Sequence, residues 1–198
     1  MTPPERRALD VFIKNPSVAL KTARLHGNGF IQMDLVPGVR LHVWGDRVPA
    51  GQRVYTGIHD HRFGFTSRVL HGVMVNVDLI VGTGDDFELW TPESRPGTED
   101  TKLQPTGEFC DFEIGTVLSV HAGQVYSFPP YLFHETYTRG LTVTLMTKTF
   151  SDPAYRVRVA VPCGTRPDNL FDRDQAVKTA GCQVLLEEVV TRIRDQYV

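Results

Sequence analysis

Two histidines stand two residues apart in GIHDHRFGFTSRVLHG, the segment from Gly57 to Gly72. On a β-strand, residues i and i+2 point to the same face, so His59 and His61 would project together and could bind one metal ion. The same alternation also places ordinary polar pairs on a solvated strand face. The pair by itself leaves both interpretations open.

A third histidine lies far downstream, in GQVYSFPPYLFHETYT. Pro129 follows Gly123 after five residues, and His134 follows that proline after four more. Imidazole suits Fe, Zn, Cu and Ni, so a histidine pair on one strand and a third histidine elsewhere can form one metal site. We therefore treat His59, His61 and His134 as candidate metal ligands.

These two segments resemble the two sequence motifs of the cupin superfamily, over roughly residues 39 to 150. The histidine pair and the closing Gly72 fit the first motif, and the downstream segment fits the second with its usual spacing. The resemblance implies a cupin double-stranded β-helix, also called a jelly-roll barrel, with a metal ion on the three histidines. The alternative is a degenerate cupin whose histidines are satisfied by hydrogen bonds.

Phe65 stands where the first cupin motif usually has a glutamate ligand. The remaining three-histidine set resembles that of the thiol dioxygenases, the cysteine and cysteamine dioxygenase type, and HDH followed by RVLHG is similar to their first motif. No cysteine occupies position 65, so the Cys–Tyr crosslink of some members cannot form, and TLMTKTFS replaces their Ser-x-His-x-Tyr run. The resemblance implies an Fe(II) dioxygenase that acts on a small thiol or carboxylate with O2. Zn, Mn or Ni are alternative metals for this site.

Two further functions fit the same motifs. A metal-dependent isomerase or lyase-type cupin would use the ion as a Lewis acid without oxygen chemistry, and a non-catalytic cupin would only bind a small ligand. A 2-oxoglutarate oxygenase is disfavoured because its first motif is HxD, whereas this chain has HxH. A serine hydrolase is disfavoured because the sequence has no GxSxG.

Side chains next to the histidine pair are candidates for handling the substrate. If the strand through His59 and His61 is unbroken, Tyr55 and Arg53 share its inward face. An arginine beside the metal could hold a substrate carboxylate through two hydrogen bonds, and a tyrosine could orient bound oxygen. Arg53 and Tyr55 are therefore the predicted catalytic residues, and Arg40 is a second candidate for the carboxylate.

Other polar residues near the motifs are expected to be structural. Asp60, between two candidate ligands, should face away from the metal and make a turn or surface hydrogen bond. Four further histidines should be satisfied within the fold: His26, His42, His71 and His121.

Helical patterns occur only towards the two ends of the chain. Residues 3–15 and 17–27 predict short N-terminal helices, and residues 172–197 predict a longer amphipathic helix. Many short β-rich runs fill the barrel region of about residues 39–161, and residues 91–107 predict an exposed loop within it. We expect a single mainly β cupin domain over residues 1–198.

The 198 residues carry a formal net charge of -2, which gives no basic footprint for nucleic acid and no polybasic membrane patch. No apolar stretch approaches the about 20 residues of a membrane span. Three widely spaced cysteines favour a reducing cytoplasm. Because cupins commonly pair, we expect the apolar stripe of Leu186, Val190 and Ile193 to pack on the barrel or in a homodimer.

Overall fold

The computed structural model describes residues 1–48, 57–94, 101–167 and 180–197. Its helices and strands are, in chain order, α1 (Pro3–Lys14), α2 (Pro16–Leu20), β1 (Arg24–His26), β2 (Phe30–Val36), β3 (Val39–Trp44), β4 (Phe63–Ser94), β5 (Thr101–His121), β6 (Val125–Phe128), β7 (Phe133–Ser151), β8 (Val159–Pro162) and α3 (Ala180–Tyr197).

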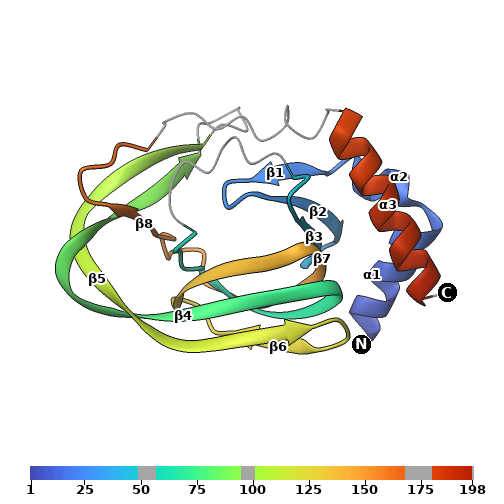
Figure 1. Ribbon diagram of the computed structural model, residues 1–198, viewed down its shortest axis with the longest axis horizontal. Helices are drawn as coiled ribbons and strands as arrows, with labels where there is room; N and C mark the ends of the chain where they lie inside the picture. The colour runs from blue at the N-terminus through green and yellow to red at the C-terminus, as the bar shows by residue number, and fades with distance from the viewer. Residues whose placement is uncertain (49–56, 95–100, 168–179, 198) are drawn as a thin grey trace.

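The strands form one curled antiparallel sheet. Its order is β1-β2-β3-β7-β4-β5, and both β6 and β8 pair with β4. The three helices lie together outside the end of the sheet that contains β1, β2 and β3 (Figure 1). The prediction of a mainly β fold with short N-terminal helices and one C-terminal helix is confirmed, and the curled sheet is consistent with a cupin jelly roll.

The helices cover one face of β3 and leave its other face to the interior of the curl. Val39, Leu41 and Val43 belong to the core cluster shared with α1 and α3, whereas Arg40 and Trp44, on the alternate face, line a cavity. The apolar stripe of α3, which consists of Leu186, Val190 and Ile193, belongs to the same cluster. The chain itself therefore buries this stripe.

The second predicted helix is shorter than its sequence pattern suggests. It ends at Leu20, and Arg24–His26 form β1, which pairs with Phe30–Gln32 of β2. The Thr22 hydroxyl donates to the Ala19 carbonyl (2.8 Å), which satisfies one backbone acceptor at the helix end. The prediction of a helix over residues 17–27 is wrong in its second half, because the pairing with β2 is a contact that local periodicity does not encode.

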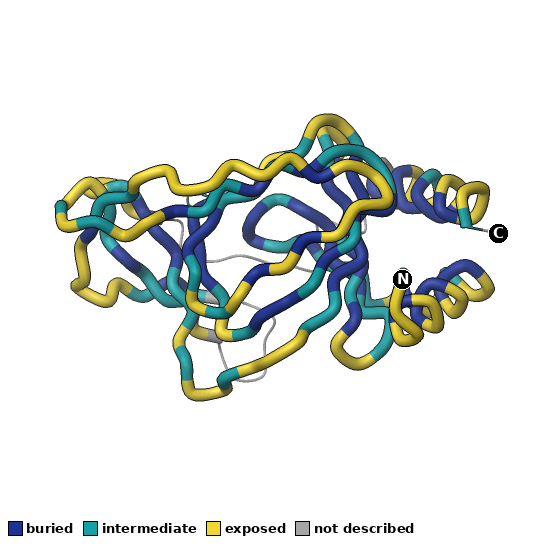
Figure 2. The backbone as a smooth tube through the Cα atoms, turned by 90° about the horizontal axis from the view of Figure 1, so that it is seen from below, coloured by how far each residue is buried: buried dark blue, intermediate teal, exposed yellow. Residues whose placement is uncertain are grey.

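β4 is one long, bent element that joins the parts of the sheet. Its first half pairs with β6 and β7, whereas the stretch from Val73 to Ser94 pairs with β5 and, over a short part, with β8. Several register shifts lie within the ladders with β5 and β7. Such bulges bend a strand and increase its twist. Most residues of β5 are exposed, whereas buried stretches lie on the inside of the fold (Figure 2).

The predicted loop over residues 91–107 is largely strand. Thr91, Pro92 and Glu93 of β4 pair with Gln104, Leu103 and Lys102 of β5, so the polar composition of this segment belongs to a hairpin. Residues 95–100 lie outside the described part of the chain. Composition predicted exposure here but could not show that the two polar runs pair.

The strands β1 and β2 extend the sheet beyond the predicted barrel region of about residues 39–161. The described C-terminal helix begins at Ala180, and residues 172–179 of the predicted helix lie outside the described chain. Among the described residues, no helix has the length and apolar character to cross a membrane. The single-domain assignment stays a prediction.

Candidate metal centre

His59 and His134 lie on backbone segments that pair directly. They form an isolated antiparallel bridge, and a second bridge joins His59 to Val159 of β8. The predicted strand over residues 53–61 is reduced to this bridge within residues 57–61, while residues 53–56 lie outside the described chain. Even without a continuous strand, His59 and His61 turn their rings towards one another, with centroids 4.7 Å apart.

The three candidate ligands converge on one point. One side-chain nitrogen from each of His59, His61 and His134 lies within 4.8 Å of the other two. Nitrogen ligands about 2.0–2.1 Å from one ion lie closer together than this, so binding requires small side-chain rotations. Among the described residues, no carboxylate or thiol belongs to this group.

Backbone carbonyls orient two of the imidazoles. The Nδ1 atom of His59 lies 2.7 Å from the Gly57 carbonyl oxygen, and Nδ1 of His134 lies 3.4 Å from that of Leu132. A carbonyl only accepts hydrogen bonds, so each Nδ1 carries the hydrogen and each Nε2 keeps its lone pair for a metal. A carbonyl partner on the far nitrogen is the arrangement typical of metal-binding histidines.

Asn28, in the turn between β1 and β2, packs against the ring of His59. Its amide nitrogen lies 3.1 Å from both ring nitrogens of His59. An atom at the same distance from both nitrogens is not in line with either lone pair. Asn28 therefore contacts the ring without blocking the direction in which Nε2 would bind a metal.

Burial keeps the histidines neutral. Loss of hydration lowers the pKa of His59, and lowers the pKa of His61 and His134 well below the ordinary value. The neighbouring imidazoles lower the pKa of His61 and His134 further, because a second positive charge nearby is unfavourable. Neutral imidazole is the form that binds metal, so these residues are ready ligands near pH 7.

An apolar wall stands beside the three histidines. The Phe65 ring lies 5.5 Å from the His61 ring and 6.3 Å from the His134 ring, and only 7% of Phe65 is exposed. Phe128 stacks on Phe65 and lies 4.5 Å from the His134 ring. The position that usually supplies a glutamate in cupins thus presents a ring that cannot coordinate.

Asp60 is buried in an ion pair, so the prediction of a surface hydrogen bond is wrong. Its carboxylate accepts from the Arg158 backbone N–H (2.7 Å) and Nε (3.0 Å), and the Tyr155 hydroxyl also donates to it. Only 1% of Asp60 is exposed. Sequence alternation placed it away from the metal, but could not show that the segment before β8 covers it. These bonds fix the segment that carries His59 and His61.

A cavity of about 680 Å³ opens from the three histidines. His26, His42 and Arg40 line it, together with Trp44 and Lys148. Burial lowers the pKa of His42 to about 3, so His42 is a neutral polar group on the cavity wall. In the sequence, Arg40, His42 and Trp44 occupy every second position, and the apolar Leu41 lies between the first two. This alternation was the signal that could have predicted that the three residues share the cavity face.

The structure does not test every residue of the predicted site. The predicted catalytic residues Arg53 and Tyr55 lie outside the described residues. Thr136, two residues after His134, lines the cavity and donates to the Asn76 side-chain oxygen (2.9 Å). Lys148 had no distinguishing sequence motif, because only the pairing of β7 with β3 and β4 brings it to the cavity.

Comparison with known proteins adds little to this geometry. No family model and no curated protein matches the chain. Solved structures that align with it include protein NMB1881 from Neisseria meningitidis (TM-score 0.31, 13% identity, 61% of this chain and 82% of that one). Another is hydroquinone 1,2-dioxygenase from Sphingomonas sp. TTNP3 with 4-hydroxybenzoate bound (TM-score 0.31, 9% identity, 58% of this chain and 61% of that one). A third is hydroquinone 1,2-dioxygenase PnpCD in complex with Cd2+ and 4-hydroxybenzonitrile (TM-score 0.32, 13% identity, 61% of this chain and 62% of that one).

The chain spans about three fifths of the length of the two dioxygenases that it aligns with. At these TM-scores and identities, the alignments do not bear on the activity of this chain. The chemistry of the candidate site therefore has to be argued from its own residues.

Proposed function

We propose that the protein is a metal-dependent cupin enzyme, a non-haem Fe(II) dioxygenase that acts on a small thiol or carboxylate. The observation that carries this proposal is the convergence of two buried histidines and one half-buried histidine with no carboxylate ligand among the described residues. His59, His61 and His134 would hold the ion from one side. When bound, Fe(II) supplies a centre at which substrate and O2 can be activated together.

The surrounding residues have separate roles in this proposal. Phe65 and Phe128 exclude water beside the ligands, and the resulting low local dielectric strengthens the attraction for an anionic substrate. Asp60 and Arg158 hold the ligand segment in place. Arg53 and Tyr55 remain proposed catalytic residues, the first to bind a carboxylate and the second to orient oxygen.

A Lewis-acid function is the second candidate, because the same three imidazoles also suit Zn or Ni. An isomerase or lyase-type cupin would then use the cavity without consuming oxygen, and a non-catalytic cupin would only bind a ligand there.

The free thiols of Cys110 and Cys163 fit the proposed cytoplasmic setting. The proposed homodimer rests only on the resemblance to cupins.

Oxygen consumption separates the two candidate functions. The full chain, reconstituted anaerobically with Fe(II), should consume O2 when mixed with at least one member of a panel of thiols, amino acids and small carboxylic acids. The Zn-loaded protein is the matched control and should consume none. Tight binding of Zn or Mn, weak binding of Fe(II) and no uptake with any compound would contradict the dioxygenase proposal and favour the Lewis-acid alternative.

A further inference from the structure

A lysine lies close to the candidate metal centre, on the same cavity. The Lys148 ammonium sits over the Phe63 ring, 4.4 Å from its centroid. Phe63 stacks on the His61 ring, with centroids 4.8 Å apart and an interplanar angle of 28°. These two distances together set the largest possible separation between the Lys148 ammonium and the centre of the His61 ring. One small molecule can span that separation.

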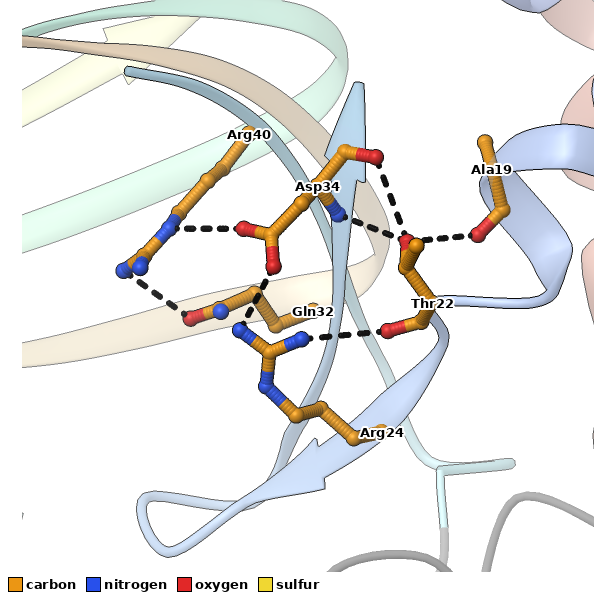
Figure 3. A network of polar contacts seen from close by, with 6 residues as sticks. All are labelled: Ala19, Thr22, Arg24, Gln32, Asp34 and Arg40. Carbon is orange, nitrogen blue, oxygen red and sulfur yellow. Dashed lines mark hydrogen bonds and ion pairs between the residues drawn. The ribbon is translucent and has the colours of Figure 1, made fainter. Parts of the chain in front are cut away.

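The charge around Lys148 is not balanced by the protein. Asp34 is the nearby carboxylate, and it already pairs with Arg24 (2.8 Å) and Arg40 (2.9 Å), as Figure 3 shows. Within the described part of the chain, no carboxylate lies within ion-pair distance of Lys148. Burial, together with the positive charges of Arg40 and Arg62, lowers its pKa to about 8. A bound anion would balance this charge.

Flat aromatic side chains form part of the cavity wall. Phe30 packs on Trp44 with ring centroids 4.1 Å apart, and Phe63 and Phe65 lie on the histidine side. A cavity of about 680 Å³ falls within the range of roughly 300–1,000 Å³ that holds drug-sized ligands. This volume is large for a three-carbon thiol and suits a molecule that contains a ring.

We propose that the cavity binds a planar aromatic carboxylate, with its carboxylate on Lys148 and its ring between the aromatic walls and the three histidines. This inference rests on the proposed function and narrows its substrate class from small thiols and carboxylates to aromatic acids. The ammonium supplies the charge, and the aromatic walls select a flat body.

Calorimetric titration of the full-length, Zn-loaded protein with benzoate tests the inference. Benzoate should bind at least tenfold more tightly than benzamide, its neutral isostere, and more tightly than 3-mercaptopropionate. Lys148→Met should weaken benzoate at least tenfold and leave benzamide unchanged. Lys148→Arg keeps the charge and should retain most of the affinity. Lys21→Met, at an exposed lysine, is the matched control.

The results of this titration test the binding of an aromatic carboxylate independently of the proposed dioxygenase function. Equal affinity for benzoate and benzamide, tighter binding of 3-mercaptopropionate, or unaltered benzoate binding by a folded Lys148→Met variant would overturn the aromatic carboxylate, even if the histidines bind metal. Lys148-dependent binding of benzoate to metal-free protein would support the subsite even if Fe(II) did not bind. The unfolding midpoint of each variant shows whether it is folded.

Discussion

His59 and His134 exchange two backbone hydrogen bonds: the His59 N–H donates to the His134 carbonyl (3.1 Å), and the His134 N–H donates to the His59 carbonyl (3.0 Å). This reciprocal pair joins the two halves of the candidate site, which lie far apart in the sequence. Because this bridge joins the two candidate ligands directly, the positions of their backbones relative to each other are set by its geometry. The site is thus built by the fold before any ion binds.

Asp60→Asn should strongly destabilise the protein. The substitution leaves the Arg158 guanidinium beside a neutral amide in a buried position, and removing one partner of a buried pair typically costs about 3–5 kcal/mol. Because Arg158 is about one third exposed, we expect about 2–4 kcal/mol from the unfolding curve in urea. Asp46→Asn, at an exposed position, should change the free energy of unfolding by less than about 0.5 kcal/mol. Equal stability of the two variants would contradict the structural role of Asp60.

Leu186→Ala should destabilise the protein by about 2–5 kcal/mol, because this side chain is 1% exposed and packs between α3 and the sheet. Val184→Ala is the matched control on the same helix, since Val184 is 59% exposed. Thermal or chemical unfolding of the two variants gives the comparison. Similar losses from both would show that α3 does not use the face seen in the structure.

Phe65→Glu should retain the metal and lose oxygen consumption. A carboxylate at this position would reach the ion from beside His61 and occupy a coordination position that the proposed reaction needs for substrate or O2. Phe65→Leu keeps the wall apolar and should retain activity. Metal content and oxygen uptake are measured on the same samples. Full activity of a metal-loaded Phe65→Glu variant would contradict the role assigned to the open position.

Benzoate affinity should fall as the pH rises through about 8, the lowered pKa of Lys148. Below this pH the ammonium is charged and attracts the carboxylate, and above it the neutral amine does not. The other charged groups that face Lys148 are Arg24, Arg40, Arg62 and Asp34. Titrations across this range should show up to about a tenfold loss per pH unit above the midpoint. The Lys148→Arg variant should show no such loss, and the same pH profile in both proteins would assign it to another group.

The sequence predicted the parts of the molecule that depend on local pattern. The alternation of His59 and His61 and the cupin-like spacing to His134 brought together the three residues that the structure places side by side. The mainly β fold followed from the short strand-forming runs between glycines and prolines. These features are local, or are carried by a resemblance to known motifs.

The parts that sequence could not predict depend on contacts between distant segments. Arg158 reaches Asp60 only because the stretch before β8 folds back over the ligand segment. Lys148 reaches the cavity only because β7 pairs with both β3 and β4. The strand Arg24–His26 exists because β2 lies beside it, although its residues carry a helical pattern. No local rule encodes these pairings.

Metal content is the most direct test of the site. Purified protein should carry about one metal ion per chain by elemental analysis, bound by three histidines. The His59→Ala/His134→Ala double variant should lose nearly all of it, while His121→Ala, at an exposed histidine outside the cluster, should keep it. Undiminished metal content in a folded double variant would contradict a metal centre on these residues.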